Sequence, residues 1–210
     1  MVRTAVALAD RGGLDSLSMR KLADKLGVVP MALYKHVANK DELLDAMVDI
    51  VFEELEFPGG GSWRSAMRAR AISMREGLSR HPWAVGLMEV RAPGPANLRH
   101  HNATMACLRK DAGLPFRMAV HAYSLMDSYI YGSALQEKTL PIDIPAEAET
   151  RLRVIAAEQP SHANEYPYLA EIGVEFAKSG YDYREEFEFG LDAILDAIER
   201  RRKLRSASTT

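Results

Sequence analysis

Residues 18–40 read SMRKLADKLGVVPMALYKHVANK, and this stretch decides the fold of the N-terminal part of the chain. Ser18 is a favoured helix N-cap, and Gly27 is a favoured residue just past a helix end. The apolar positions between them, Leu22, Ala23 and Leu26, lie on one face of a helix. Pro30 suits the first turn of the next helix, where its missing N–H is not needed. Two short helices joined by a tight glycine turn predict a helix-turn-helix.

The segments around this stretch complete a small helical domain. Residues 4–12 predict a short helix that ends at two glycines. Asn39 predicts the start of a further helix, with Glu42 three positions on in a capping-box arrangement. We therefore expect a DNA-binding domain at residues 1–45, a connecting helix at about 40–56, and a hinge at the glycine-rich run near residue 58.

The rest of the chain predicts more helices, which we assign to a larger domain at residues 46–210. The expected helices are 62–80, 96–111, 116–137, 165–178 and 182–204, with an irregular segment over 138–164 that has room for a helix at 146–158. The segment 116–137 is apolar on nearly all sides, which predicts that it is buried. No stretch indicates a strand, so the predicted fold class is all-α.

Charge is distributed unevenly along the chain. The net charge is -2, yet residues 18–40 hold five basic residues and one acidic residue, a local charge of +4. A basic stretch on an acidic chain is typical of a small face that meets phosphates, although a solvated helix face explains it equally well. The single cysteine, the absence of a long apolar run and the lack of a signal pattern after Met1 predict a cytoplasmic protein with no membrane partner.

The motif around Gly27 resembles the TetR family of transcriptional regulators. The similarity lies in Gly27, in LYKHV at residues 33–37, in Asn39-Lys40 and in the acidic-aliphatic run that begins at Glu42. It covers residues 4–50 well and continues more weakly through a tetracycline-repressor-like C-terminal domain. The resemblance implies a homodimer that binds palindromic operator DNA and is released by a small hydrophobic effector.

The resemblance also implies roles for individual residues, which their chemistry supports. The helix that begins at Ser18 faces the phosphates, with Arg20 placed for a phosphate or a guanine, and the start of the recognition helix at residues 30–32 meets thymine methyls. Tyr34 and His36 are expected to donate to phosphates, and Lys40 adds a phosphate contact at the start of the fourth helix. Pro30 and Met31 depart from the tetracycline repressors, so the operator should differ. The expected DNA-binding residues are Ser18, Met19, Arg20, Pro30, Met31, Ala32, Tyr34, Lys35, His36 and Lys40.

An effector site is expected among the helices of the larger domain. Polar residues there interrupt apolar faces, and convergent polar groups in an apolar setting are what a small-molecule site needs. The equally simple explanation is that methionine-rich faces form the core. The expected ligand-binding residues are Met74, Leu78, Met88, Asn102, Met105, Tyr123, Met126, Asp127, Ile130 and Tyr131.

No cofactor or metal is expected. Tetracycline repressors hold a magnesium–drug complex through histidines, and the matching positions here fall near Glu89 and Ser128, which predicts a different effector. The pair His100-His101 and the separate His121 show no metal-ligand spacing with carboxylates, and His100-His101 are interpreted as surface or pocket-rim residues.

The second subunit is expected to pack on the last two helices. Their apolar stripe, which would otherwise pack within one subunit, consists of Phe187, Leu191, Ile194, Leu195 and Ile198. Three other functions stay open at this point: a DNA-binding regulator without a ligand, a protein–protein module with a degenerate helix-turn-helix, and a helical enzyme. The spacing of His121 and Asp127 places them on different faces of one helix, which disfavours the enzyme.

Overall fold

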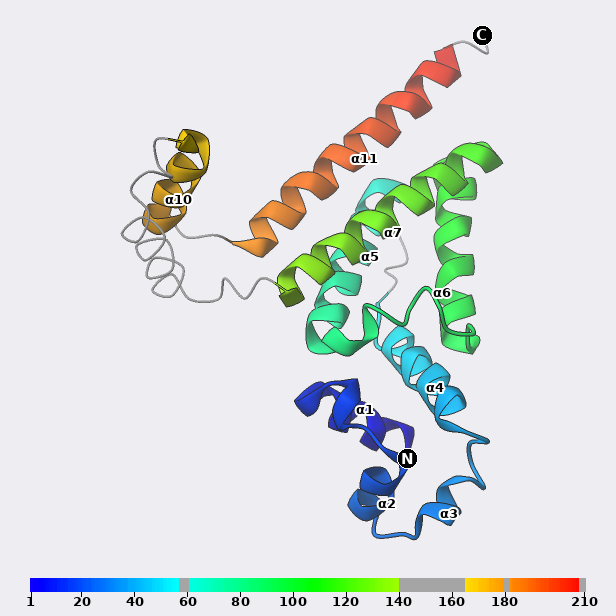
Figure 1. The fold of residues 1–210 in the computed structure, drawn as a ribbon. Helices are drawn as coiled ribbons and strands as arrows, with labels where there is room; N and C mark the ends of the chain where they lie inside the picture. The colour runs from blue at the N-terminus through cyan, green and yellow to red at the C-terminus, as the bar shows by residue number, and fades with distance from the viewer. Residues whose placement is uncertain (57–60, 140–164, 180–181, 208–210) are drawn as a thin grey trace. The chain divides into compact units, whose positions relative to one another are not determined.

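The computed structural model describes residues 1–56, 61–139, 165–179 and 182–207. The regular elements in these ranges are helices, which confirms the all-α fold class (Figure 1). Contacts divide the chain into one compact unit of residues 1–135 and 190–210 and a second of residues 136–189. The expected hinge near residue 58 and the expected helix at 146–158 lie outside the described residues.

Short helices with clear local signals form the N-terminal part. They are α1 (Val2–Gly12), the 3-10 turn η1 (Leu14–Ser16), α2 (Met19–Leu26) and α3 (Pro30–Leu33). Ser18 caps α2 by accepting the Lys21 N–H at 3.2 Å, and Gly27 ends it with φ 68°, a backbone angle that glycine adopts without strain. Helix α3 ends at Leu33, and residues 34–36 continue it as turns rather than as α-helix.

The connecting helix α4 (Lys40–Glu53) begins as the sequence predicts. The Asn39 side chain accepts the Glu42 N–H at 2.9 Å, and the Glu42 carboxylate in turn accepts the N–H of Ala38. One side of α4 packs on α1 and another on α6 (Pro95–Ala106). The same helix therefore contacts both the helix-turn-helix region and the helices after residue 61 (Figure 1).

The remaining helices of the first unit build its larger core. After α5 (Trp63–Arg80) come the turn η2 (Pro82–Ala84), α6, a π-helical turn η3 (Cys107–Asp111) and α7 (Phe116–Thr139). One apolar face of α5 is buried along its whole length: Trp63, Met67, Ala71, Met74 and Leu78. In contrast, the prediction that residues 116–137 are buried is wrong in part, because several apolar side chains of α7 are exposed: Phe116, Val120, Leu125 and Leu135.

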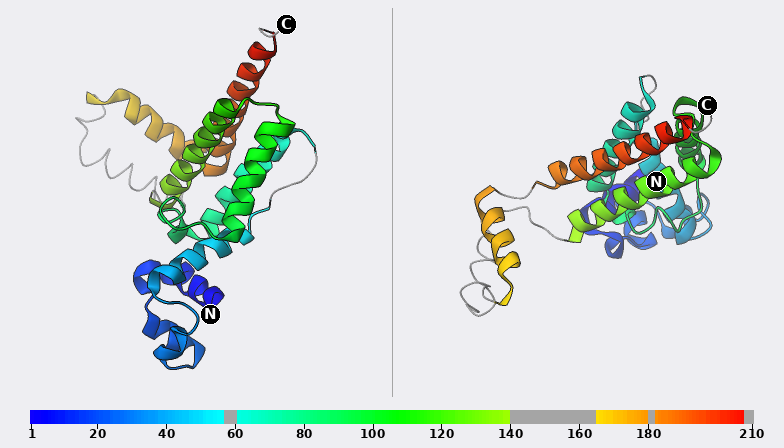
Figure 2. Two further views of the ribbon diagram at one scale, coloured as in Figure 1. Left: turned by 90° about the vertical axis from the view of Figure 1, so that its right-hand side faces the viewer. Right: turned by 90° about the horizontal axis from the view of Figure 1, so that it is seen from above.

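Helix α11 (Tyr183–Ala207) corrects the predicted dimer interface. Phe187, Leu191, Leu195 and Ile198 are at most 2% exposed in the single chain, and Ile194 is half-buried. From Gly190 onward α11 lies beside α5 and α7, and the two long helices α7 and α11 run antiparallel (Figure 2). The stripe thus packs within the chain, because neighbouring helices of the same subunit supply the apolar surface that it needs.

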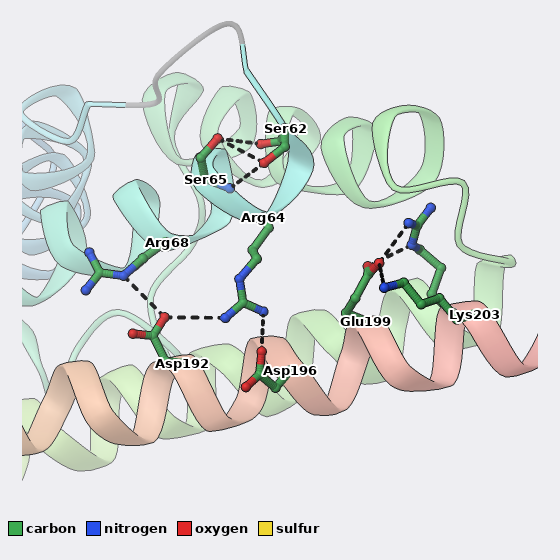
Figure 3. Close-up of polar contacts among 9 residues, drawn as sticks. Ser62, Arg64, Ser65, Arg68, Asp192, Asp196, Glu199 and Lys203 are labelled. Carbon is green, nitrogen blue, oxygen red and sulfur yellow. Dashed lines mark hydrogen bonds and ion pairs between the residues drawn. The ribbon is translucent and has the colours of Figure 1, made fainter.

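Ion pairs hold α5 against α11 at the surface. Arg64 lies 2.8 Å from Asp196, and Arg68 Nε lies 3.3 Å from Asp192, to which Arg64 also extends (Figure 3). These partly exposed pairs contribute little free energy individually but fix which face of α11 meets α5.

The second unit contains α10 (Pro167–Ser179), which begins at a proline as many helices do. Its described apolar residues are exposed within the chain: Tyr168, Leu169, Ile172 and Val174. Among the described residues, no helix combines the length and the apolar character that crossing a membrane requires.

Candidate functional site

The surface around α3 separates its buried residues from its exposed residues as DNA reading requires. Leu33 and Val37 are 2% and 5% exposed and fix α3 to the core of the N-terminal helices, whereas Met31 is 72% exposed and Tyr34 is 46% exposed. Lys35 and His36 are exposed as well. An anchored short helix with a protruding basic and aromatic edge is the arrangement that enters a major groove.

Most of the predicted DNA-binding residues lie on this exposed surface. Ser18, Arg20, Pro30, Met31, Tyr34, Lys35, His36 and Lys40 are exposed, and Met19 and Ala32 are half-buried. The described structure brings Ser18 and Lys40 to the starts of α2 and α4, where N–H groups and the helix dipole favour phosphate. The Ser18 hydroxyl oxygen already accepts a backbone bond as the cap of α2, so a phosphate contact would use its O–H.

A buried ion pair lies in the core formed by α5 and α7. Arg70 is 0% exposed, and its Nη2 donates to Asp127 Oδ1 at 2.7 Å. Arg70 Nε and Nη1 and Asp127 Oδ2 have no hydrogen-bond partner among the described residues. Burying charged groups with unmet hydrogen bonds costs free energy, so this pair contributes less to stability than apolar residues of the same volume would.

Aromatic and imidazole rings from three helices surround the pair. Phe52 of α4 packs on the rings of His100 and His101 in α6, at centroid distances of 5.4 and 5.6 Å. Tyr123 of α7 hydrogen-bonds His101 Nδ1, and the Arg70 guanidinium lies 5.7 Å from the centre of the Tyr123 ring. The ring set thus connects the connecting helix α4 directly to the surroundings of the ion pair.

Burial decides the protonation of these rings. Burial, then the Arg70 cation, and then His101 lower the pKa of His100 to about 3, so this imidazole is neutral at pH 7. Burial, then the Arg70 cation, lower the pKa of His101 against the opposing effect of Asp127. Burial and the Asp127 carboxylate raise the pKa of Tyr123 and Tyr131, which keep their phenol protons.

The structure places the predicted ligand-binding residues in three groups. Met74, Leu78, Met88, Met126, Asp127 and Ile130 are buried, and Met105, Tyr123 and Tyr131 are half-buried. Asn102 lies on the exposed face of α6, apart from these buried residues, and its role in ligand binding stays a prediction. His100 is buried and His101 is half-buried, so neither is a surface residue, and their interpretation as pocket-rim residues stays a prediction.

Sequence reasoning missed Arg70 and Phe52. A signal for Arg70 was available, because this arginine follows Met67 by three residues and precedes Met74 by four, which places its charge on an apolar helix face. Phe52 had no such signal, because an aromatic residue on an apolar helix face is typical of the core. Only the structure shows that its ring packs on His100 and His101.

Polar contacts tie α4 to the start of α6. Asp49 Oδ1 accepts the Asn97 N–H at 2.8 Å, and Asp49 Oδ2 accepts the Ala96 N–H at 3.2 Å. A Cβ at Gly94 would lie 2.6 Å from either of these oxygens, so glycine is what allows Asp49 to approach. One turn and two turns earlier on α4, Asp45 and Asp41 lie 3.7 and 2.7 Å from Arg91.

His81 joins the N-terminal helices to the turn after α5. Its buried ring lies 2.7 Å from Asp10 of α1 through Nδ1 and 3.0 Å from Glu54 through Nε2. Trp83 Nε1 donates to the same Asp10 oxygen at 2.7 Å. Residues 81 and 83 are therefore bonded both to α1 and to the residue that follows α4.

In the described part of the chain, no group of three or more histidine, cysteine or acidic residues could hold a metal ion.

Known proteins share both halves of this architecture. Residues 2–47 match the family described as bacterial regulatory proteins, tetR family, and residues 57–202 match the tetracyclin repressor-like C-terminal domain. The HTH-type transcriptional repressor DrrR1 of Streptomyces coeruleorubidus is 33% identical, over 95% of this chain and 76% of that protein. The class A tetracycline repressor protein from transposon 1721 in Escherichia coli is 30% identical, over 96% of this chain and 90% of that protein.

Solved structures agree with the sequence relatives. The TetR family protein ActR of Streptomyces coelicolor, in complex with actinorhodin, superimposes with a TM-score of 0.76 at 28% identity and covers 96% of this chain and 95% of that chain. ActR has also been solved in complex with (S)-DNPA, with a TM-score of 0.72, 29% identity and 94% of each chain covered. The chain therefore belongs to the TetR family of bacterial transcriptional regulators.

Proposed function

We propose that this protein is a repressor that binds a palindromic operator as a homodimer in the cytoplasm and releases it when a small hydrophobic effector binds among α4 to α7. The observation that carries the proposal is the exposed edge of Tyr34, Lys35 and His36 next to the buried anchors Leu33 and Val37. Two such edges about one DNA turn apart, ~34–36 Å, read the two halves of a palindrome.

Exposed apolar residues on α7 support the proposal that the protein forms a homodimer. Leu125 and Leu135 lie on one side of the helix, with the exposed Gly132 between them, and Val120 is exposed nearer the start of the helix. Small and apolar residues on neighbouring turns let two helices approach closely, and such a face costs free energy while it meets water. Homodimer formation through α7 covers this face and replaces the internal stripe of α11 as the expected interface.

The contacts of α4 supply a route from effector to operator. An effector beside Arg70 contacts the rings of Tyr123 and His101, which pack on each other. The His101 ring also packs on Phe52 of α4, so the effector site is connected to α4. Any shift of α6 moves its bonds to Asp49, and α4 then moves relative to its contacts with α1. A change in the spacing of the two recognition helices weakens operator binding, with a coupling energy of about 1–3 kcal/mol typical of such effectors.

Operator binding is the direct test. Selection from randomised duplex DNA at low salt should enrich a palindrome, and fluorescence anisotropy then gives its affinity. Replacing Tyr34 and Lys35 together by alanine should weaken binding at least about tenfold, because each contributes groove or phosphate contacts of about 1–3 kcal/mol. The matched control is Lys110→Ala, an exposed lysine on η3.

The outcomes separate the alternatives. If no duplex is enriched, or if the double variant binds as the parent does, the repressor proposal is wrong and the protein–protein module is favoured. If the operator is bound but no compound in a broad screen of hydrophobic molecules releases it, the regulator without a ligand is favoured instead.

A further inference from the structure

The buried pair of Arg70 and Asp127 carries information about the chemistry of the effector. Arg70 has three N–H groups, one on Nε and two on Nη1, for which the described residues supply no acceptor. Asp127 Oδ2 is an acceptor for which the described residues supply no donor within hydrogen-bond geometry, since the nearby Tyr123 hydroxyl bonds His101 Nδ1. Both side chains are more than nine-tenths buried, so bulk water does not satisfy these groups.

The unmet groups stand next to apolar surface. Helical spacing places Met74 one turn after Arg70 on α5, and it places Ile130 one turn after Asp127 on α7; both are 0% exposed. The half-buried Tyr123 precedes Asp127 by one turn and presents its ring to Arg70. A molecule that reaches the ion pair must therefore also have an apolar body.

Charge restricts the molecule further. The positive charge of Arg70 and the negative charge of Asp127 cancel, the neighbouring His100 is neutral, and the other nearby acid, Glu89, is exposed to solvent. An anionic ligand would leave one uncompensated negative charge beside Asp127, and a cationic ligand would leave one uncompensated positive charge beside Arg70. Uncompensated buried charge is strongly unfavourable, whereas neutral hydrogen-bonding groups are not.

We propose that the effector is an uncharged molecule that presents a carbonyl-type oxygen to Arg70 and, on the adjoining atom, a hydroxyl or amide N–H to Asp127 Oδ2, on an apolar body that packs on Met74 and Ile130. This inference rests on the proposed function, since it names the chemistry of the same effector site. It explains why a costly ion pair with unmet hydrogen bonds occupies this core.

A matched set of probes tests the inference on the full-length protein. The set is 2-naphthamide, which carries an acceptor and a donor, methyl 2-naphthoate, which carries the acceptor alone, and 2-naphthoate, which is anionic. Isothermal titration calorimetry should show that the amide binds about tenfold or more tighter than each of the others, because a site built for a donor rejects an analogue that lacks it.

Changing the charge of the pair should reverse the ranking. In Asp127→Asn, Arg70 loses its counter-ion, so 2-naphthoate should bind more tightly than the amide. Asp192→Asn is the matched control: it neutralises a carboxylate that pairs with arginines at the surface (Figure 3) and should leave the ranking unchanged. If Asp127→Asn does not fold, the double variant Arg70→Met with Asp127→Leu replaces the pair by apolar residues and should abolish the preference for the amide over the ester.

Several results would overturn the inference. These are tighter binding of 2-naphthoate by the parent protein, a ranking that survives in both variants, or no binding of the amide at millimolar concentration, as expected if water alone occupies the site. Operator affinity measured on the same preparations distinguishes the two failures. Intact operator binding with any of these results refutes the effector chemistry alone, and loss of operator binding refutes the repressor proposal.

Discussion

At the residue scale, the burial of His100 lowers its pKa and so makes the stability of the protein depend on pH. Its folded-state pKa of about 3 lies below the value of about 6.5 that it regains on unfolding. The unfolded chain therefore binds a proton that the folded chain refuses, and the free energy of unfolding falls as the pH drops from about 6.5 toward 3.

Replacing His100 by glutamine should remove this contribution. Between pH 7 and pH 5, the parent should lose about 2 kcal/mol more unfolding free energy than His100→Gln does, since each pH unit below 6.5 costs about 1.4 kcal/mol for one proton. Urea unfolding monitored by circular dichroism at several pH values measures the difference. The exposed His121→Gln is the control, and a similar pH slope for His100→Gln and the parent would contradict the assignment.

At the scale of elements, α4 connects the N-terminal helices to α6, and one of its side chains makes hydrogen bonds to the α6 backbone. Asp49 accepts two N–H groups from the first turn of α6, which otherwise lack partners within that helix. The bond pair makes the position of α6 depend on that of α4 and supplies the α6 start with the acidic cap that its own sequence lacks.

Asp49→Ala should loosen this junction. We expect a loss of about 1 kcal/mol in unfolding free energy, the typical cost of deleting an N-terminal cap, and faster hydrogen exchange at the Ala96 and Asn97 amides. Urea unfolding and hydrogen-exchange mass spectrometry provide the two measurements. Asp15→Ala, an exposed acid on η1, should change neither, and unaltered exchange at both amides in Asp49→Ala would show that Asp49 does not hold the start of α6.

At the scale of the whole molecule, the proposed repressor function requires a second subunit, and we expect that subunit to pack on the exposed apolar residues of α7. Leu125→Arg places a charge among these residues, so it should dissociate the dimer and weaken operator binding at least about tenfold, because one subunit reads only half of a palindrome.

The control for this prediction is Leu98→Arg, which introduces the same charge at an equally exposed leucine of α6. Sedimentation velocity should report a monomer for Leu125→Arg and a dimer for Leu98→Arg and the parent. A dimeric Leu125→Arg protein would move the interface away from α7.

Local signals allowed much of this protein to be predicted. The caps at Ser18 and Asn39, the turn at Gly27 and the anchors Leu33 and Val37 depend on neighbours within a few residues, so the helix-turn-helix and its exposed edge follow from the sequence. The all-α class follows for the same reason, since an apolar period near 3.6 residues is a property of each segment by itself.

Tertiary structure alone decided which polar groups are buried together and which apolar faces remain exposed. The sequence could not show that Arg70 meets Asp127 across 57 positions, that His100 lies inside, or that the α11 stripe is covered within one subunit while α7 keeps an open face. A helical pattern shows that a face needs a partner but not which helix supplies it, because that choice depends on how several helices pack at once.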